Sequence, residues 1–317
     1  MKNLLKIRNF ALIALFAVFA VSCDDDNDED NTITGKASAN ANLSILSQAL
    51  VRADLATTLR GAGPYTVFAP TNQAFTSFLA ARNYATINDV PKEALTQILL
   101  NHVVTGSVKS TNLTTGYIKT LAKGSASATN TLSMYVNITS GVKLNGTATV
   151  TTADVMASNG VIHIVDRVLD LPSVVTHVSA NSNFSALAAA LNRPGAPDFI
   201  ASLSATGPFT VFAPTNAAFT SLDAELAPGG IAGLTSANLT KVIQYHVVSP
   251  ANVLAASLTE GQVITPILTP TQTFMIQLSG GAKIKDARNR ISNITITDIQ
   301  CSNGVIHAID KVLLPIF

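Results

Sequence analysis

Apolar residues recur at helical spacing in two stretches that resemble each other. Leu43, Leu46 and Leu50 lie three and four residues apart, and the same spacing returns between Phe184 and Leu191. Residues three and four apart share one face of a helix, so each stretch predicts an amphipathic helix with one buried stripe.

A second pair of helices is predicted further along the chain. Pro91 suits the first turn of the earlier one, and apolar residues at increments of three and four lead from Leu95 to His102. The same increments lead from Leu239 to His246. Both histidines fall on the apolar stripe, which favours buried, hydrogen-bonded histidines over a metal ligand or a general base that substrate must reach.

Between these helices a corner from strand to helix is predicted. The run Tyr65 to Phe68 is typical of a strand, and Pro70 stops it. Thr71 is then expected to cap a helix that buries Phe75, Phe78 and Leu79.

Strand patterns dominate the later part of each half. Runs rich in Thr, Val and Ile lie at 134–139, 142–144 and 147–155. Hairpin turns are predicted at Asn159-Gly160 and Asn303-Gly304, because this dipeptide accepts positive φ values. The following run, Val161 to Leu169, is apolar on both faces, which predicts a central strand.

The two halves are copies of one unit. TVFAPTNQAF from Thr66 returns as TVFAPTNAAF, NHVV from Asn101 returns as YHVV, and NGVIHIVDRVL from Asn159 returns as NGVIHAIDKVL. Equivalent residues are 144 positions apart in all three blocks, as from Thr66 to Thr210. A constant offset over separated blocks indicates one fold built twice.

These three blocks resemble the conserved boxes of the fasciclin (FAS1) domain, in the same order and twice over. The resemblance implies an α+β fold in which a β-sandwich or wedge packs against helices, present here as two tandem FAS1-like domains. It assigns the duplicated motif residues mainly to the framework: Thr66, Pro70, Thr71, Asn72, His102, Asn159, Gly160, His163 and Asp166, with Thr210, Pro214, Thr215, Asn216, Tyr245, His246, Asn303, Gly304, His307 and Asp310. Asn101 departs from the Tyr that is usual in the family, which is expected to soften local packing in the first copy.

Domain boundaries follow from the repeat. The first domain is expected at residues 32–171 and the second at 172–317. The early helices are 141 rather than 144 residues apart, which places a three-residue insertion near Asn192 to Phe199, where Pro and Gly indicate a loop.

Residues 1–22 are interpreted as a lipoprotein signal peptide. Basic residues precede an apolar run from Phe10 to Val21, which is shorter than the roughly 20 residues that span a bilayer. The sequence AVSC resembles a lipobox, so Cys23 is the expected lipidation site. The open alternative is ordinary secretion with a stray cysteine.

Residues 23–31 are interpreted as an acidic tether. Six carboxylates within Asp24 to Asp30 repel one another and favour a solvated segment. The run resembles a surface-export signal of lipoproteins in one group of Gram-negative bacteria, which would place the domains outside the cell on the outer membrane. A spacer on the periplasmic face is the alternative.

Composition limits the classes of partner. The chain is 47% hydrophobic and 12% charged with a net charge of +1, which indicates globular domains and gives no reason to expect nucleic acid as a partner. Without Trp, an aromatic sugar-binding platform is not favoured. Cys301 is expected to be a small buried residue, because a reactive thiol needs cationic neighbours.

Motifs for catalysis are missing from the sequence. It contains no G-x-S-x-G, H-E-x-x-H, C-x-x-C, P-loop, Rossmann or calcium-loop motif, so no enzyme activity, cofactor or metal is predicted. His102, His163 and Asp166 would carry a hydrolase only if they converged in an open cleft.

The sequence therefore favours a cell-surface adhesion module that binds an extracellular protein or matrix ligand without catalysis. The alternative is a lipoprotein that binds glycans or small ligands for nutrient capture. Ligand contacts are expected on the segments that differ most between the repeats, Arg82 to Asp89, Asp223 to Gly233 and Asn192 to Phe199, because loops on a rigid scaffold tolerate variation.

Overall fold

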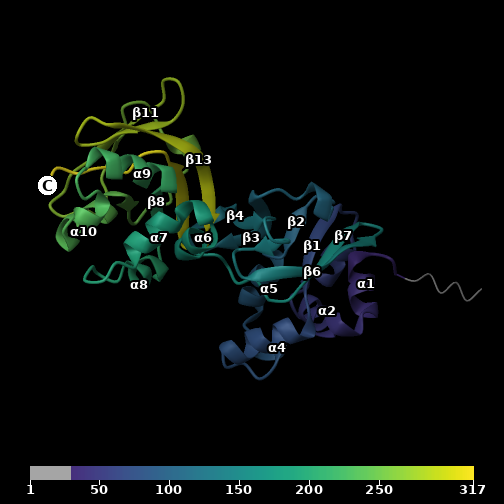
Figure 1. Cartoon of the computed structure of the whole chain (residues 1–317). Helices are drawn as coiled ribbons and strands as arrows, with labels where there is room; N and C mark the ends of the chain where they lie inside the picture. Colours follow the sequence, from purple (N-terminus) through teal and green to yellow (C-terminus); the bar gives the residue numbers. More distant parts are fainter. Residues whose placement is uncertain (1–29) are drawn as a thin grey trace, which may run out of the picture.

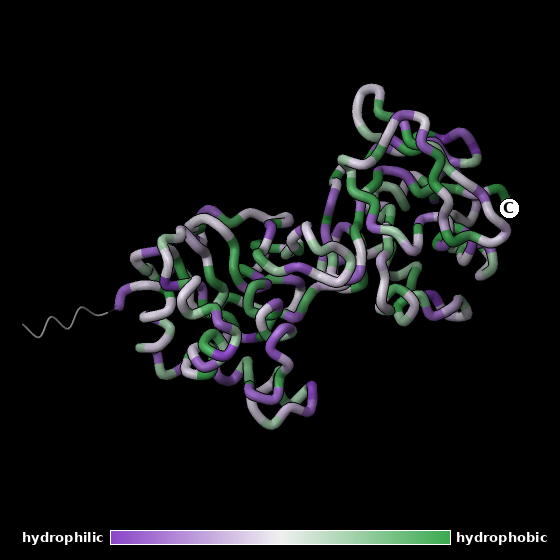
Figure 2. The backbone as a smooth tube through the Cα atoms, turned by 180° about the vertical axis from the view of Figure 1, so that it is seen from behind, coloured by the Kyte–Doolittle hydropathy of each residue, from purple (hydrophilic) through white to green (hydrophobic). Residues whose placement is uncertain are grey.

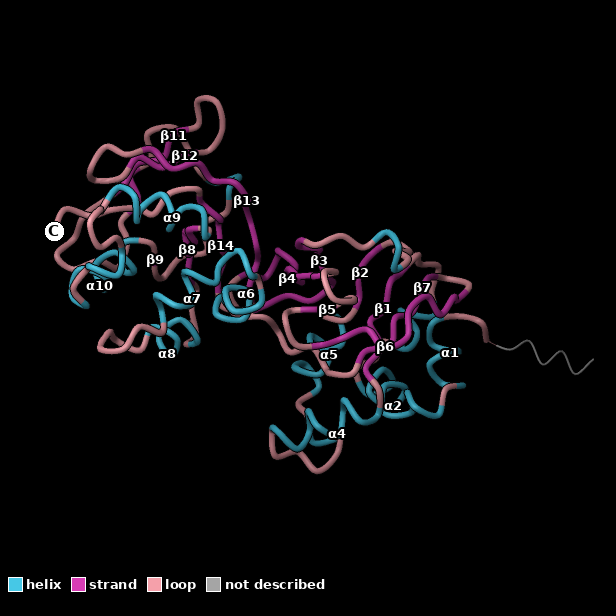
Figure 3. The backbone as a smooth tube through the Cα atoms, in the orientation of Figure 1, coloured by secondary structure: helices cyan, strands magenta, loops and turns pink. Residues whose placement is uncertain are grey.

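A computed structural model describes residues 30–317, in which two lobes follow each other along the chain (Figure 1). Each lobe combines helices with a seven-stranded sheet (Figure 3). Hydrophobic segments run through the interior of both lobes (Figure 2). The signal-peptide interpretation, Cys23 and the acidic residues before Asp30 lie outside the described residues.

The first lobe, domain 1, contains the elements from α1 to β7. Its helices are α1 (Ile33–Ala39), α2 (Ser44–Arg52), α3 (Ala56–Arg60), α4 (Asn72–Ala81) and α5 (Lys92–Leu100), with 3-10 turns η1 (Ala41–Leu43), η2 (Ile87–Asp89) and η3 (Ser110–Asn112). Its strands are β1 (Tyr65–Pro70), β2 (Val103–Thr105), β3 (Gly116–Gly124), β4 (Ser127–Asn137), β5 (Lys143–Leu144), β6 (Ala148–Ala157) and β7 (Gly160–Val165).

Domain 2 repeats this order. Its helices are α6 (Val174–Ala180), α7 (Ser185–Leu191), α8 (Phe199–Ser204), α9 (Asn216–Glu225) and α10 (Ser236–Tyr245), with η4 (Ser182–Phe184), η5 (Ile231–Gly233) and η6 (Ala255–Ser257). Its strands are β8 (Phe209–Pro214), β9 (Val247–Val248), β10 (Val263–Ile264), β11 (Phe274–Gln277), β12 (Lys283–Lys285), β13 (Ile291–Cys301) and β14 (Gly304–Ile309).

The sheet of domain 1 has the order β2-β1-β7-β6-β5-β4-β3, and that of domain 2 has the order β10-β11-β12-β13-β14-β8-β9. In each domain one pair is parallel, β1 with β7 and β8 with β14, and the other pairs are antiparallel. Register shifts bend β6 and β13. The predicted α+β fold with two tandem domains is confirmed, and β7 is central but ends at Val165 rather than Leu169.

Each domain has two hydrophobic clusters because its strands are buried on both faces. In β1, Val67 and Ala69 pack against the helices, whereas Phe68 between them packs against strand residues such as Met134. This is the alternation that a strand imposes on neighbouring side chains. In domain 2 the same division separates Val211 from Phe212.

The predicted corner between β1 and α4 forms, with some corrections at the helix ends. The Thr71 hydroxyl accepts a hydrogen bond from the Ala74 N–H, and Phe75 is buried, but Phe78 is only half-buried. Pro91 lies just before α5, at the N-cap. Because α5 ends at Leu100, His102 follows the helix instead of lying on its stripe.

The two domains touch through an asymmetric interface. The β3–β4 hairpin of domain 1 lies against α6 and β13 of domain 2 (Figure 1). The Gln300 N–H donates to the Ser133 hydroxyl at 3.0 Å, and Lys119 Nζ donates to the Asp298 carbonyl at 2.8 Å. The Tyr117 ring meets the His177 ring edge-on at 5.3 Å between centroids. This interface fixes the domains side by side through specific side chains.

The first described residues contact domain 1. The Asp30 carboxylate accepts a hydrogen bond from Arg60 Nε at 3.0 Å, and the Asn31 carbonyl accepts one from the Ser158 N–H at 2.8 Å. The last residues of the segment interpreted as a tether therefore lie against the folded domain.

Candidate functional site

The residues of the first motif join β1 to its neighbours. The Thr66 hydroxyl donates to the Gly106 carbonyl at 2.6 Å and accepts from the Val108 N–H at 2.9 Å. Asn72 accepts from the Ile45 N–H and donates to the Ala41 carbonyl, both at 2.9 Å. Pro70 ends β1 beside β7. Thr210, Pro214, Thr215 and Asn216 occupy the same positions in domain 2.

The histidines that follow α5 and α10 are buried and bridge two backbone segments. His102 Nε2 accepts a hydrogen bond from the Leu169 N–H at 2.8 Å, so Nδ1 carries the proton that is donated to the Ile98 carbonyl at 2.7 Å. His246 makes the same pair of bonds with Leu313 and Val242. Burial lowers the pKa of both imidazoles to about 4, so both are neutral at pH 7.

The histidines within β7 and β14 are also enclosed. His163 stacks on Phe68, and its Nε2–H donates to the Val108 carbonyl at 2.9 Å. His307 repeats this arrangement with Phe212 and Val253. These hydrogen bonds fasten the loop after β2, or after β9, to the central strand.

Asp166 and Asp310 bind the start of the neighbouring strand. Asp166 Oδ1 accepts from the Thr149 N–H at 2.7 Å, and Asp310 Oδ1 accepts from the Asn293 N–H at 2.7 Å. Among the described residues, no hydrogen bond or ion pair connects Asp166 with His102 or His163. The convergence that a hydrolase would need is therefore not present in this geometry.

The Asn-Gly pairs form turns, but for a different reason from the one predicted. Asn159 does not have positive φ; its amide donates to the Leu59 and Gly61 carbonyls and its oxygen accepts from the Ile33 N–H. At Gly160 a Cβ atom would lie 2.0 Å from the Tyr65 carbonyl oxygen. Asn303 and Gly304 have the same roles, so these turns tie helices to the sheet.

Asn101 and Tyr245 occupy equivalent positions in the two domains but make different hydrogen bonds. The Asn101 amide is fully buried and donates to the Asp170 carbonyl at 2.9 Å. The Tyr245 hydroxyl donates to the Thr273 carbonyl and accepts from the Ala287 N–H, and burial raises its pKa to about 12. The softer packing expected at Asn101 is not apparent, because its amide is buried and hydrogen-bonded.

Within residues 30–317, no three His, Cys, Asp or Glu side chains are grouped to hold a metal ion. Cys301 is buried in the core of domain 2, and burial raises the pKa of its thiol. No helix in this part of the chain is long and apolar enough to cross a membrane.

An open cleft lies on the helical side of each domain. In domain 1 it has a volume of about 440 Å³, lies between α2 and α4, and is rimmed by the segment from Tyr84 to Asn88. In domain 2 a cleft of about 330 Å³ lies between α7 and α9 and is rimmed by Asp223, Ile231 and Ala232. Gln48 and Ala189 occupy equivalent places in the two clefts, so the clefts are counterparts.

The variable segments of domain 2 meet at its cleft. Arg193, in the inserted loop, donates hydrogen bonds to the carbonyls of Ile231, Ala232 and Leu234 at 3.2, 2.9 and 2.9 Å. Asp223 accepts from the Ile231 N–H at 2.7 Å. The segments Asn192 to Phe199 and Asp223 to Gly233, both expected to contact ligand, are thus hydrogen-bonded to each other at the domain 2 cleft. The third such segment, Arg82 to Asp89, rims the domain 1 cleft.

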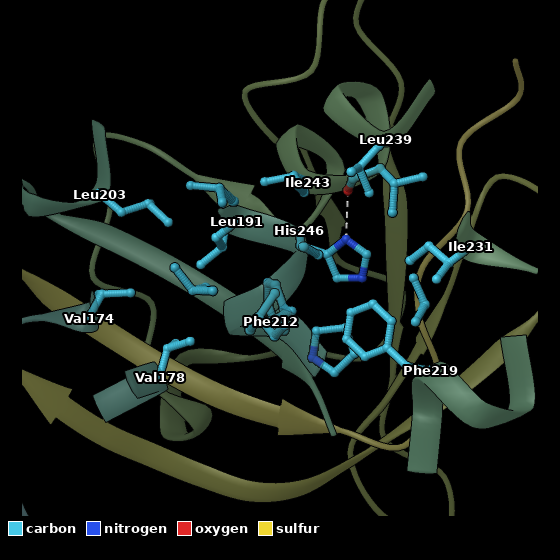
Figure 4. A pocket seen from close by; sticks show the side chains of 17 residues that line it. Val174, Val178, Leu191, Leu203, Phe212, Phe219, Ile231, Leu239, Ile243 and His246 are labelled. Atoms are coloured by element: carbon cyan, nitrogen blue, oxygen red, sulfur yellow. Dashed lines mark hydrogen bonds between the residues drawn. The ribbon is translucent and has the colours of Figure 1, made fainter. Parts of the chain in front are cut away.

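Behind the domain 2 cleft lies an enclosed cavity of about 20 Å³ (Figure 4). Apolar side chains such as Leu191, Phe219 and Leu239 line it, together with His246, whose Nδ1 bond to the Val242 carbonyl is drawn in the figure. This volume admits roughly one water molecule, and apolar cavities stay dry. We therefore regard it as a packing gap rather than a ligand site.

Sequence reasoning missed the interface residues Tyr117 and His177. His177 is fully buried, and neither of its ring nitrogens has a hydrogen-bond partner among the described residues. One signal was available: the repeat places Lys36 at the position of His177, so this histidine does not belong to the shared framework.

Comparison with known proteins identifies the family. The sequence model of the Fasciclin domain matches residues 41–172 and 182–315. Protein sll1483 of Synechocystis sp. (strain ATCC 27184 / PCC 6803 / Kazusa) is 38% identical over 145 residues, which are 45% of this chain and 73% of that protein. Human periostin is 28% identical over 263 residues, 81% of this chain and 29% of periostin, so the chain spans less than a third of periostin's length.

Among solved structures, the FAS1 domain pair from the insect cell adhesion molecule Fasciclin I matches this chain with a TM-score of 0.49 and 18% identity over 89% of this chain and 96% of that one. The family assignment rests on the two domain matches, which together cover most of the chain. The chain therefore belongs to the Fasciclin domain family and carries two tandem FAS1 domains.

Proposed function

We propose that this chain is a non-catalytic adhesion module that binds an extracellular protein or matrix ligand through the paired clefts. The proposal rests on a difference between the motif residues and the segments that vary between the repeats. The duplicated motif residues are engaged in internal hydrogen bonds, whereas the segments that differ between the repeats rim the clefts. A scaffold with variable loops is the usual arrangement of a recognition surface.

The chemistry of the clefts suits a protein ligand. Domain 1 offers Ile45 and Tyr84 beside polar Gln48 and Asn88, and domain 2 offers apolar alanines beside Arg193. Such mixed linings match an apolar side chain flanked by polar groups. A glycan ligand would favour exposed aromatic rings, and this disfavours a glycan in the domain 2 cleft, where Phe219 is buried.

We also propose that Cys23 carries a lipid and that the chain is displayed on the outer face of the outer membrane. A membrane anchor would let two weak sites act together on a surface, because the second contact forms at high effective concentration.

Cleft-filling variants test the proposed ligand site. Gln48→Trp in domain 1 and Ala189→Trp in domain 2 place a large ring in each cleft from an exposed helix position. Binding of the full chain to arrays of matrix proteins and glycans should fall at least tenfold in the double variant, and less in each single variant.

Ala94→Trp provides the matched control, because Ala94 is exposed on α5 and does not line either cleft. It should bind like the unmodified chain. Equal binding by the control and the double variant would remove the clefts as the ligand site, and turnover of any arrayed compound would refute the non-catalytic proposal.

A further inference from the structure

The interface between the domains uses a different surface of each domain. Domain 1 contributes the outer side of its β3–β4 hairpin, including the cross-strand pair Tyr117 and Tyr135, which we call the hairpin face. Domain 2 contributes α6 and the end of β13, including His177 and Gln300, which we call the helix face. Because both domains have one fold, each also possesses the surface that the other uses.

Strand register identifies the hairpin face of domain 2. In domain 1 Val136 pairs with Leu144, and in domain 2 Ile276 pairs with Ile284 at the equivalent step of the sheet. Met275 directly precedes Ile276, and Tyr135 directly precedes Val136, so Met275 corresponds to Tyr135. The cross-strand partner of Met275 is Val263, which corresponds to Tyr117.

The hairpin face of domain 2 is uncovered and apolar. Tyr135 is 3% exposed, whereas Met275 is 40% and Val263 is 57% exposed. Directly paired residues of an antiparallel pair project from the same side of the sheet, so these two side chains form one patch. Strands β10 and β11 are two and four residues long, against nine and eleven for β3 and β4, so no extended hairpin tip shields the patch.

The helix face of domain 1 is uncovered in the same way. Met156 corresponds to Gln300 under the 144-residue repeat, and it is 50% exposed where Gln300 is 1% exposed. On α1, Lys36 takes the place of the fully buried His177 and is half-buried. Each chain thus presents one unoccupied hairpin face on domain 2 and one unoccupied helix face on domain 1.

We propose that a second copy of this chain occupies these faces, so that the hairpin face of one copy docks on the helix face of the next. The contact continues the interface already present within the chain. At these two faces Met156 takes the place of Gln300, and Met275 and Val263 take the places of Tyr135 and Tyr117, so the side chains that would meet are apolar and gain from removal from water. Exposed apolar patches of this kind mark protein interfaces.

The proposed contact is heterologous, because different surfaces meet. Such a contact does not close in a dimer and instead builds rings or open chains of copies. It involves few side chains, so association is weak in dilute solution and becomes effective where copies are concentrated on a surface. This self-association is separate from ligand binding in the clefts.

Two charge variants test the proposal by complementation. Met275→Lys disables the hairpin face, and Met156→Lys disables the helix face; both positions are exposed, so folding should be unaffected. Sedimentation velocity of the full chain in non-ionic detergent should detect species larger than a dimer that increase with concentration. Each variant alone should lose at least tenfold in association constant, whereas an equimolar mixture should form dimers that do not grow.

Val51→Lys is the matched control, because Val51 is an exposed apolar residue outside both faces, and this variant should associate normally. The proposal is overturned if the unmodified chain stays monomeric up to its solubility limit, or if association survives both variants. Loss of association in Met275→Lys together with normal association in Met156→Lys would indicate a symmetric contact and refute the head-to-tail assembly. Gln48→Trp with Ala189→Trp should leave association unchanged, which separates this result from the test of ligand binding.

Discussion

At the scale of single residues, buried histidines hold separate backbone segments together. His102 and His246 each join the last turn of a helix to the chain segment that follows the central strand. Each does so as a neutral imidazole that donates through Nδ1 and accepts through Nε2. A side chain used at both nitrogens is not free for acid–base catalysis.

His246→Ala should therefore weaken domain 2. The substitution leaves a cavity and removes the hydrogen-bond partners of the Leu313 N–H and the Val242 carbonyl, so the free energy of unfolding should fall by about 1–3 kcal/mol. Urea unfolding followed by circular dichroism measures the change. Thr297→Ala, at an exposed position on β13, is the control and should change stability by less than about 0.5 kcal/mol. Unchanged stability with loss of ligand binding would give His246 a functional role.

Stability should also decrease on mild acidification. Burial lowers the pKa of His102 and His246 from 6.5 to about 4 and that of His177 to about 3, so the unfolded chain binds more protons than the folded chain below pH 6.5. The stabilisation is fully present above pH 6.5 and is lost as the pH falls towards 4. Between pH 7.5 and pH 5 each histidine should cost about 2 kcal/mol, from the difference in proton binding.

Urea unfolding at these two pH values measures the effect. In His246→Gln the loss of unfolding free energy between these pH values should be smaller by the contribution of His246. His177→Gln should show the same reduction for the histidine at the domain interface. A pH dependence that is identical in the unmodified chain and in His246→Gln would contradict the assignment of a neutral buried imidazole.

At the scale of elements, short polar turns decide how helices attach to the sheet. Asn303 binds the start of α6 through the Val174 N–H and the C-terminal end of α8 through the Leu203 and Ala205 carbonyls. One side chain thereby positions two helices against β14. The equivalent Asn159 does the same for α1 and α3.

Asn303→Ala should lower the melting temperature of domain 2 and the free energy of unfolding by about 2–4 kcal/mol, because three backbone groups lose a partner at once. Asn303→Asp retains the oxygen that accepts from the Val174 N–H but loses both amide donor bonds, so its stability should lie in between. Calorimetry of the two variants is the measurement. Equal stability of the alanine variant and the unmodified chain would show that the turn alone positions the helices.

At the scale of the whole molecule, the proposed anchor can be tested directly. Cys23→Ala should abolish acylation and release the protein from membranes, because a thiol is the attachment point of the lipid. Membrane fractionation and metabolic labelling with a fatty acid measure the two effects. A Cys23→Ala protein that remains in the membrane fraction would contradict the lipoprotein interpretation.

The acidic run has a separate predicted role. Replacing the carboxylates from Asp24 to Glu29 by Ser and Gly should prevent surface display while keeping the lipid. Asp30 stays unchanged in this variant because it pairs with Arg60 in domain 1. Unchanged accessibility to external protease would leave the run as a simple spacer.

Much of the fold could be predicted from the sequence because local physical chemistry fixes it. The spacing of Leu43, Leu46 and Leu50 predicts the helix that forms at α2, and Pro70 with Thr71 predicts the corner from strand to helix. These features depend on side-chain periodicity and on the conformational limits of single residues, which act within a few positions. The constant repeat extended each local prediction to the second domain.

Sites made by distant segments could not be predicted in the same way. The amide of Asn159 meets carbonyls about 100 residues away, so its role as a tie between helix and sheet is not visible in the turn that it occupies. The sequence identified the variable segments as candidates, but it did not show that two of them meet at the domain 2 cleft, where Arg193 binds the carbonyls of Ile231 and Leu234.

By itself, the sequence determined that the chain is a duplicated α+β unit with a shared framework, because the repeat and its periodicities are local properties. Only the tertiary structure decided which copy of each surface is covered. Tyr135 and Met275 occupy equivalent positions, as do Gln300 and Met156, yet one of each pair is buried and the other exposed. The physical reason is that burial depends on which surface packs against the neighbouring domain, and that choice depends on contacts between residues far apart in the sequence, such as Ser133 with Gln300 and Tyr117 with His177.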